Sequence, residues 1–172
     1  MKFFLTAKHW QIFILLCIGI AINSFTIVGQ PEITTVLRVT GLLISFSWQL
    51  SVGHGLYNFL PAKVEMNYNL FVINWFVFIV AYCAVLIFSD GEGMIFTGVA
   101  ALPMFYVAYA FVHILIFPGR LLTSVEMRKE AAFGDYIVTV VLMFFWPIGI
   151  WFIQPRINEV VEEKTQQIST EN

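Results

Sequence analysis

The side chains best suited to chemistry in this sequence are a few polar residues within long apolar stretches. They are His54, Asn58, Tyr109, His113 and Asp135. An imidazole changes its charge near neutral pH and is a common metal ligand, so two histidines beside a carboxylate could relay protons or hold a metal ion. Polar side chains also join helices through hydrogen bonds, and this is their more common role in helix bundles. We therefore prefer the structural interpretation and keep a polar pocket as the alternative.

These residues reach one membrane depth if the apolar stretches cross the bilayer alternately. His54 and His113 each lie within two helical turns of a proline that ends the stretch, Pro61 and Pro118 respectively. Asp135 begins the last stretch, which starts on the same side under this topology. The spacing predicts a pocket that opens to the cytoplasm, and ionisable residues inside a membrane commonly mark function.

Cofactor chemistry has little support in the sequence. A haem held by His54 and His113 is a narrower form of the pocket hypothesis, and two histidines on two helices are a weak signature for it. Cys17 and Cys83 lack metal-ligand spacing. The sequence contains no HExxH, GxSxG, Walker or GxGxxG motif. We therefore expect no metal or other cofactor, and the sequence leans toward a protein that is not an enzyme.

The composition indicates a membrane protein. Of 172 residues, 59% are hydrophobic and 12% are charged, against roughly 25% charged residues in soluble domains. The mean hydropathy is +0.83. A soluble chain of this size could not keep so much apolar surface from water. The net charge of −2 offers no basic field for nucleic acid, so the lipid bilayer is the expected partner.

Five apolar segments are long enough for membrane helices, which need about 20 residues each. We predict an all-α, polytopic transmembrane helix bundle with spans at 10–28, 35–60, 69–88, 94–117 and 133–153. They form one transmembrane domain over 1–155, and a polar C-terminal tail over 156–172 follows, of which the first part can extend as a helix. A short amphipathic cytoplasmic helix is expected at 124–128, before the last span.

The fifth segment has two interpretations because Pro147 and Gly149 lie in its middle. Proline removes a backbone donor, so this segment is either a kinked helix that spans the bilayer or a broken helix that re-enters and returns. Its length and lack of charge favour the kinked span. The Lys and Arg positions place the N-terminus in the cytoplasm. With five spans, six of the nine Lys and Arg residues lie on the cytoplasmic side, and with a returning segment eight do. The positions of the positive charges therefore mildly favour the returning segment.

One face of the second span carries small residues at helical spacing. Ser47, Ser51 and Gly55 recur every four residues, and small residues at this spacing let two helices approach closely. We therefore predict a helix-packing face, which can serve a homo-oligomer or another membrane protein.

The stretch 120–158 contains three short motifs. Ser124 and Glu126 form a Ser-x-Glu loop, Asp135 and Tyr136 begin a helix, and PIGIWFIQPRIN closes the stretch. Together these motifs resemble the C-terminal part of an uncharacterised family of small multi-pass membrane proteins common in Bacteroidota. The resemblance implies a bacterial inner-membrane location without an assigned activity. It also implies a signature site formed by Ser124, Glu126, Asp135, Pro147, Gln154 and Asn158.

Two functions stay open at this point. The leading hypothesis is a non-enzymatic scaffold or accessory subunit of a membrane complex, because the sequence holds neither a catalytic constellation nor a segment for a soluble domain. The alternative is a small-molecule or ion transporter, or a membrane enzyme, that uses the pocket around His54, His113 and Asp135.

Overall fold

The computed structural model describes residues 2–89 and 94–170, and every regular element in these ranges is helical, as predicted. The helices are α1 (Lys2–Thr6), α2 (His9–Ser24), α3 (Pro31–Tyr57), α4 (Tyr68–Phe88), α5 (Leu102–Met127), α6 (Phe133–Phe144) and α7 (Trp146–Thr170). A 3₁₀ turn, η1 (Gly98–Ala101), precedes α5.

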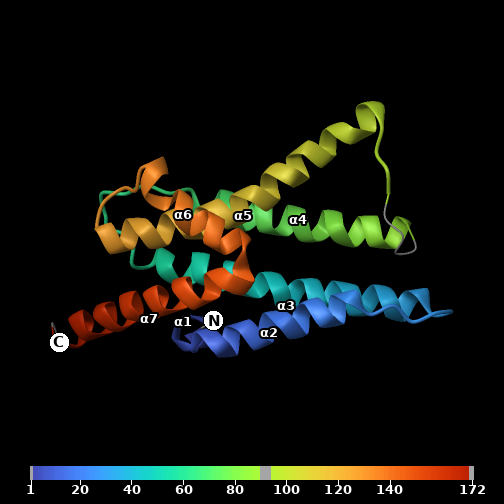
Figure 1. Ribbon diagram of the computed structural model, residues 1–172. Helices are drawn as coiled ribbons and strands as arrows, with labels where there is room; N and C mark the ends of the chain where they lie inside the picture. The colour runs from blue at the N-terminus through green and yellow to red at the C-terminus, as the bar shows by residue number, and fades with distance from the viewer. Residues whose placement is uncertain (1, 90–93, 171–172) are drawn as a thin grey trace.

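Helices α3, α4 and α5 are long and apolar enough to cross a membrane, and α2 and α6 are shorter apolar helices. Successive helices α2 to α5 run in alternating directions, with α2 along α3 and α4 along α5 (Figure 1). The connections 58–67 and 128–132 lie at one end of this bundle, which we call the hairpin end (Figure 1). The connection 25–30 lies at the opposite end (Figure 1).

Glycines of α2 and α3 make a close contact between these two helices. A β-carbon at Gly41 would overlap the backbone of Gly19 and Asn23, and one at Gly19 would lie 2.6 Å from the Ser45 hydroxyl oxygen. Residues without bulk at this crossing let the two backbones touch. The sequence analysis had placed the small-residue contact farther along α3, at Ser47, Ser51 and Gly55.

Helix α5 is longer at its end than predicted, because it passes through Pro118 and Gly119 without a break. Pro118 is buried, and within a packed bundle the neighbouring helices tolerate the missing backbone donor. Gly119 faces α6, where an added β-carbon would lie 2.9 Å from a methyl carbon of Val140. The expected amphipathic helix at 124–128 is therefore not a separate element, since it is the last turn of α5.

The predicted fifth span is divided into two helices at Phe145, and α7 turns back toward the hairpin end (Figure 1). An ion pair of 3.9 Å joins Arg128, which follows α5, to Glu163 of α7. Both ends of the α6–α7 hairpin therefore lie at the same end of the bundle. Helix α7 continues through Pro155 to Thr170, so most of the predicted polar tail is helical.

The tip of this hairpin explains why proline and glycine stand mid-segment. The Phe145 carbonyl accepts hydrogen bonds from the Ile148 nitrogen at 3.0 Å and the Gly149 nitrogen at 2.9 Å. Pro147 has no N–H that would need a partner at the start of α7. A β-carbon at Gly149 would overlap the Leu142 carbonyl oxygen. These residues thus form a tight reversal with few unsatisfied backbone groups, as an apolar environment requires.

Candidate functional site

Gln154 is the centre of a polar cluster that fixes α7 against α1 and α3. Its side chain is fully buried, and its amide oxygen accepts a 2.9 Å hydrogen bond from the Trp48 indole nitrogen. The amide nitrogen donates to the Phe4 and Ala7 carbonyl oxygens at 2.9 and 3.0 Å and to Asn158 Oδ1 at 3.1 Å. Asn158 also donates to the Ala7 carbonyl at 3.1 Å. Two residues of the predicted signature site therefore hold the carbonyl end of α1.

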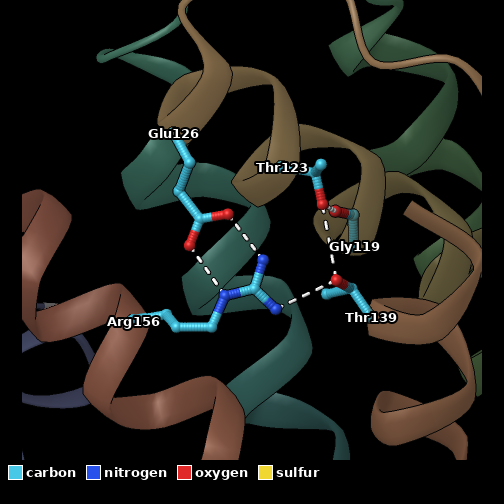
Figure 2. Close-up of polar contacts among 5 residues, drawn as sticks. All are labelled: Gly119, Thr123, Glu126, Thr139 and Arg156. Atoms are coloured by element: carbon cyan, nitrogen blue, oxygen red, sulfur yellow. Dashed lines mark hydrogen bonds and ion pairs between the residues drawn. The ribbon is translucent and has the colours of Figure 1, made fainter. Parts of the chain in front are cut away.

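A second cluster joins α5, α6 and α7 through Arg156 (Figure 2). Its Nε and Nη2 atoms donate to the two carboxylate oxygens of Glu126, at 2.7 and 2.5 Å. Its Nη1 atom donates to the Thr139 hydroxyl at 3.0 Å. That hydroxyl lies 3.4 Å from the Thr123 hydroxyl, which donates to the Gly119 carbonyl at 3.0 Å. One guanidinium therefore links three helices.

The geometry of this ion pair favours a fixed position for α7. The side chains of Arg156 and Glu126 are 33% and 26% exposed, so water screens the pair only partly. Two parallel N–H···O bonds set the direction as well as the strength of the contact. The paired Glu126 carboxylate is thereby used to hold the hairpin.

Ser124 closes the end of α5 next to this pair. Arg128 has a left-handed backbone with φ of 52°, and the Lys129 nitrogen donates to the Ser124 carbonyl at 3.3 Å, as in a Schellman cap. The Ser124 hydroxyl accepts a 3.1 Å bond from the Ala131 nitrogen. The Ser-x-Glu motif therefore turns the chain from α5 toward α6 and supplies the carboxylate for Arg156.

Asp135 caps α6 from within its first turn. One carboxylate oxygen accepts a 2.9 Å hydrogen bond from the Ala132 backbone nitrogen, and the side chain is exposed. An acidic residue at this position also interacts favourably with the helix dipole. Asp135 thus has a structural contact of its own, and no hydrogen bond joins it to His54 or His113 within ranges 2–89 and 94–170.

His54 and Asn58 line a groove at the hairpin end, between α1, α3 and α7. The groove has a volume of about 440 Å³, and Thr6 and Thr165 also contribute to its wall. His54 Nδ1 lies 2.6 Å from the Tyr68 hydroxyl, so the phenol orients the imidazole. His54 and Asn58 are the two of the five candidate residues that line this groove.

Tyr109 and His113 lie elsewhere, along one face of α5. Their ring centroids are 5.8 Å apart, and the His113 ring is 6.1 Å from that of Phe117. Phe117 is in turn 6.5 Å from Tyr68, the ring that holds His54. The described contacts therefore connect the two imidazoles through Phe117 and Tyr68 and not directly.

No group of three His, Cys, Asp or Glu side chains comes together at metal-binding distance in the part of the chain that the structure describes. A haem held by both histidines would have to lie between the two imidazoles, and the rings of Phe117 and Tyr68 lie there instead. The residues present do not form a set of ligands for either group.

No protein family, curated protein or solved structure matches this chain. The resemblance to a Bacteroidota family stays a prediction. The contacts of its signature residues are the observations that bear on the function of this chain.

The predicted packing face on α3 is used within the chain. Gly55 lies under Leu5 of α1, because a β-carbon there would overlap the leucine methyl groups. Ser51 is buried, and the Ser47 hydroxyl donates to the Ile44 carbonyl of its own helix at 2.6 Å. This face is therefore covered by α1 where it reaches the hairpin end.

Arg156 and Trp48 bind residues of the signature site, and neither was predicted to be a site residue. An available signal was the position of Arg156 within the closing motif, two residues after Gln154 and two before Asn158. A cation so close to an apolar segment needs a carboxylate partner, and Glu126 belongs to the same set of motifs.

Proposed function

We propose that this chain is an integral protein of the bacterial inner membrane that acts as a non-enzymatic scaffold or accessory subunit of a membrane complex. In this topology α2, α3, α4 and α5 cross the bilayer, and α6 and α7 form a re-entrant hairpin. The N-terminus and the hairpin end face the cytoplasm.

The charge distribution supports this orientation. With a returning hairpin, eight of the nine Lys and Arg residues belong to the cytoplasmic side, and Arg38 is the exception. Positive residues near the membrane set orientation in this direction. A fifth spanning helix would instead move Arg156 and Lys164 to the other side, away from the carboxylate of Glu126 that Arg156 contacts.

The observation that carries the non-enzymatic role is that the polar residues at the hairpin end bind one another. Gln154 and Asn158 hold α1, and Glu126 holds Arg156. Groups engaged in this way fix the positions of helices, which is the more common role of polar side chains in helix bundles. A frame held at three helices presents a constant surface to a partner within the membrane.

The α5 face with Tyr109 and His113 is where we place the partner. Tyr109 and the neighbouring Val112 are both about half exposed on this face. Polar side chains that face lipid at this position are better satisfied against another helix. The partner is either a second copy of this chain or a different membrane protein.

Photo-crosslinking in intact membranes tests this role. A photoreactive residue at Val112 should form a discrete adduct with another polypeptide, and the same residue at Val138 of α6, also exposed, should label lipid alone. A differently tagged second copy distinguishes a homo-oligomer from a hetero-complex. The proposal is wrong if Val112 yields no protein adduct and the purified chain is a monomer in mild detergent.

A small-molecule transporter or membrane enzyme is the second candidate, and the groove with His54 and Asn58 favours it. A volume of about 440 Å³ is within the usual range of ligand sites. In a deletion strain, His54→Ala and Asn58→Ala should then fail to restore the phenotype although the protein is present at normal levels. Full complementation by both variants, and by His113→Ala, would exclude this candidate.

A further inference from the structure

The re-entrant hairpin reaches only part of the way through the bilayer. Helix α6 has 12 residues, which gives roughly 18 Å at 1.5 Å per residue, against a hydrocarbon core about 30 Å thick. The tip at Phe145 therefore lies in the interior of the membrane. Beyond the tip, no other helix in the described part of the chain contributes to the space lined by α2, α3 and α5.

A cavity of about 320 Å³ lies at this position, next to the hairpin tip. Its wall is mostly apolar and comes from α2, α3, α5 and the tip. The lining residues include the aromatic side chains Phe46, Phe111, Phe144 and Trp146. On α2 the lining runs from Leu16 to Asn23, roughly 10 Å along the helix. An elongated apolar space at this depth is open to molecules dissolved in the bilayer.

Three polar side chains of the wall already donate their N–H or O–H hydrogens to other groups of the chain. They are Asn23, Ser45 and Gln49. The Asn23 nitrogen donates to the Arg38 carbonyl at 2.6 Å and to the Tyr82 hydroxyl at 3.2 Å. The Ser45 hydroxyl donates to the Gly41 carbonyl at 2.8 Å.

The Gln49 amide completes this set. We orient this amide so that its nitrogen donates to the Ser45 and Phe46 carbonyl oxygens, at 3.0 and 3.3 Å, because the opposite orientation would turn its oxygen toward these acceptors. These side chains therefore offer acceptor oxygens to a ligand. Trp146 has an indole N–H that binds no group in the described part of the chain, so the wall offers one donor as well.

The chemistry of the wall limits the classes of ligand that the cavity can bind. No charged side chain lines the cavity, so an anionic headgroup or a carboxylate would be buried without a counter-charge. A quinone carries acceptors alone and leaves the oxygen of Gln49 unmatched. A hydroxyl group both donates and accepts, so it can satisfy Gln49 and Trp146 together.

We propose that this cavity binds a neutral lipid alcohol, with its hydroxyl at Gln49 and Trp146 and its hydrocarbon body between α2, α3 and α5. This inference rests on the re-entrant topology proposed above and not on the scaffold role. Diacylglycerols and isoprenoid alcohols are two membrane sources of the same chemistry.

Quenching of Trp146 fluorescence by brominated lipids tests the site on the full chain in phosphatidylcholine nanodiscs. A dibrominated long-chain alcohol should quench part of the emission in a saturable way, and Trp146→Phe should remove that part. A dibrominated fatty acid and a brominated phosphatidylcholine of equal chain length should quench without saturation. Competition by unlabelled diacylglycerol or by an unlabelled isoprenoid alcohol distinguishes the two sources.

Gln49→Leu keeps the side-chain volume and removes the acceptor. It should weaken alcohol binding five- to tenfold, which corresponds to one hydrogen bond. Gln11→Leu is the matched control, because Gln11 accepts its 2.8 Å bond from the Lys8 nitrogen outside the cavity. This control should bind the alcohol as the wild-type chain does.

Several results would overturn the proposal. If quenching by the phospholipid saturates as quenching by the alcohol does, or if Gln49→Leu has no effect on alcohol binding, the cavity holds only generic lipid chains. No site exists if the alcohol never saturates. Should a variant fail to fold, native mass spectrometry of the wild-type chain decides, because one retained alcohol per chain is expected and its absence refutes the site. Labelling that places the α7 end outside the cell would instead refute the topology.

Discussion

Replacing Gln154 by leucine removes four hydrogen bonds from a fully buried position with little change in side-chain volume. The variant therefore separates hydrogen bonding from packing, since volume-conserving substitutions in a core have small effects of their own. Three groups lose their partner, the Trp48 indole N–H, the Phe4 carbonyl and Asn158 Oδ1. The Ala7 carbonyl keeps its bond from Asn158.

The size of the effect follows from these three groups. Trp48 is fully buried, and a buried donor left without an acceptor costs about 1–3 kcal/mol. The contacts of the Phe4 and Asn158 oxygens are only partly buried, and the two losses together add about 1 kcal/mol on the same scale. We expect Gln154→Leu to lower the free energy of unfolding by about 2–4 kcal/mol.

The assay is reversible unfolding in mixed detergent and SDS micelles, followed by far-UV circular dichroism. Combining Gln154→Leu with Trp48→Phe should give a loss about 1–2 kcal/mol smaller than the sum of the single losses, because the orphaned indole N–H is gone. Gln11→Leu, which removes an exposed hydrogen bond, should stay within about 0.5 kcal/mol of wild type. A Gln154→Leu loss below this level, or additive behaviour of the pair, would refute the role of Gln154 as the anchor of α1.

Three further predictions concern the hairpin. Glu126→Arg and Arg156→Glu should each destabilise the protein by about 1–2 kcal/mol, and the double reversal should recover at least half of that in the same assay; no recovery would contradict a direct pair. Gly149→Ala should cost at least about 2 kcal/mol, since its methyl group overlaps the Leu142 carbonyl, and faster proteolysis of α7 reports the opened tip; an unchanged digestion rate would argue against the reversal. Glu163→Cys should react with a membrane-impermeant maleimide in inverted vesicles alone, and labelling in intact cells would place α7 outside.

The length of an apolar segment is a local property of the sequence, and it predicted most of the helices. Segment 69–88 corresponds closely to α4 (Tyr68–Phe88), because a turn-forming sequence follows it. The end of α5 was misplaced because Pro118 is an ambiguous stop signal in a membrane. Whether a helix continues through proline depends on the neighbours that cover it, and α6 was not known to lie there.

The candidate pocket was predicted because its residues were expected at one depth in the membrane. Depth alone does not determine which side of its helix a residue faces. His54 and Asn58 do face one groove, since they lie four residues apart on one helix. His113 packs near Phe117 and not into this groove, while Gly119 of the same helix faces Val140 of α6. Rotation of one helix relative to another is a tertiary property, which spacing along the chain leaves undetermined.

The hairpin of α6 and α7 was the harder case, because two signals of the sequence disagreed. Segment length favoured a fifth span, while the Lys and Arg positions favoured a return. The structure shows that Pro147 and Gly149 act together: proline removes a donor at the start of α7, and glycine makes room for the Leu142 carbonyl. A kink would need neither the glycine contact nor a carbonyl at Phe145 that accepts two N–H groups. This pattern is a proline followed two residues later by a glycine within an apolar segment, with a cation and amides after it. It thus favours a segment that turns back and is held at the side on which it began.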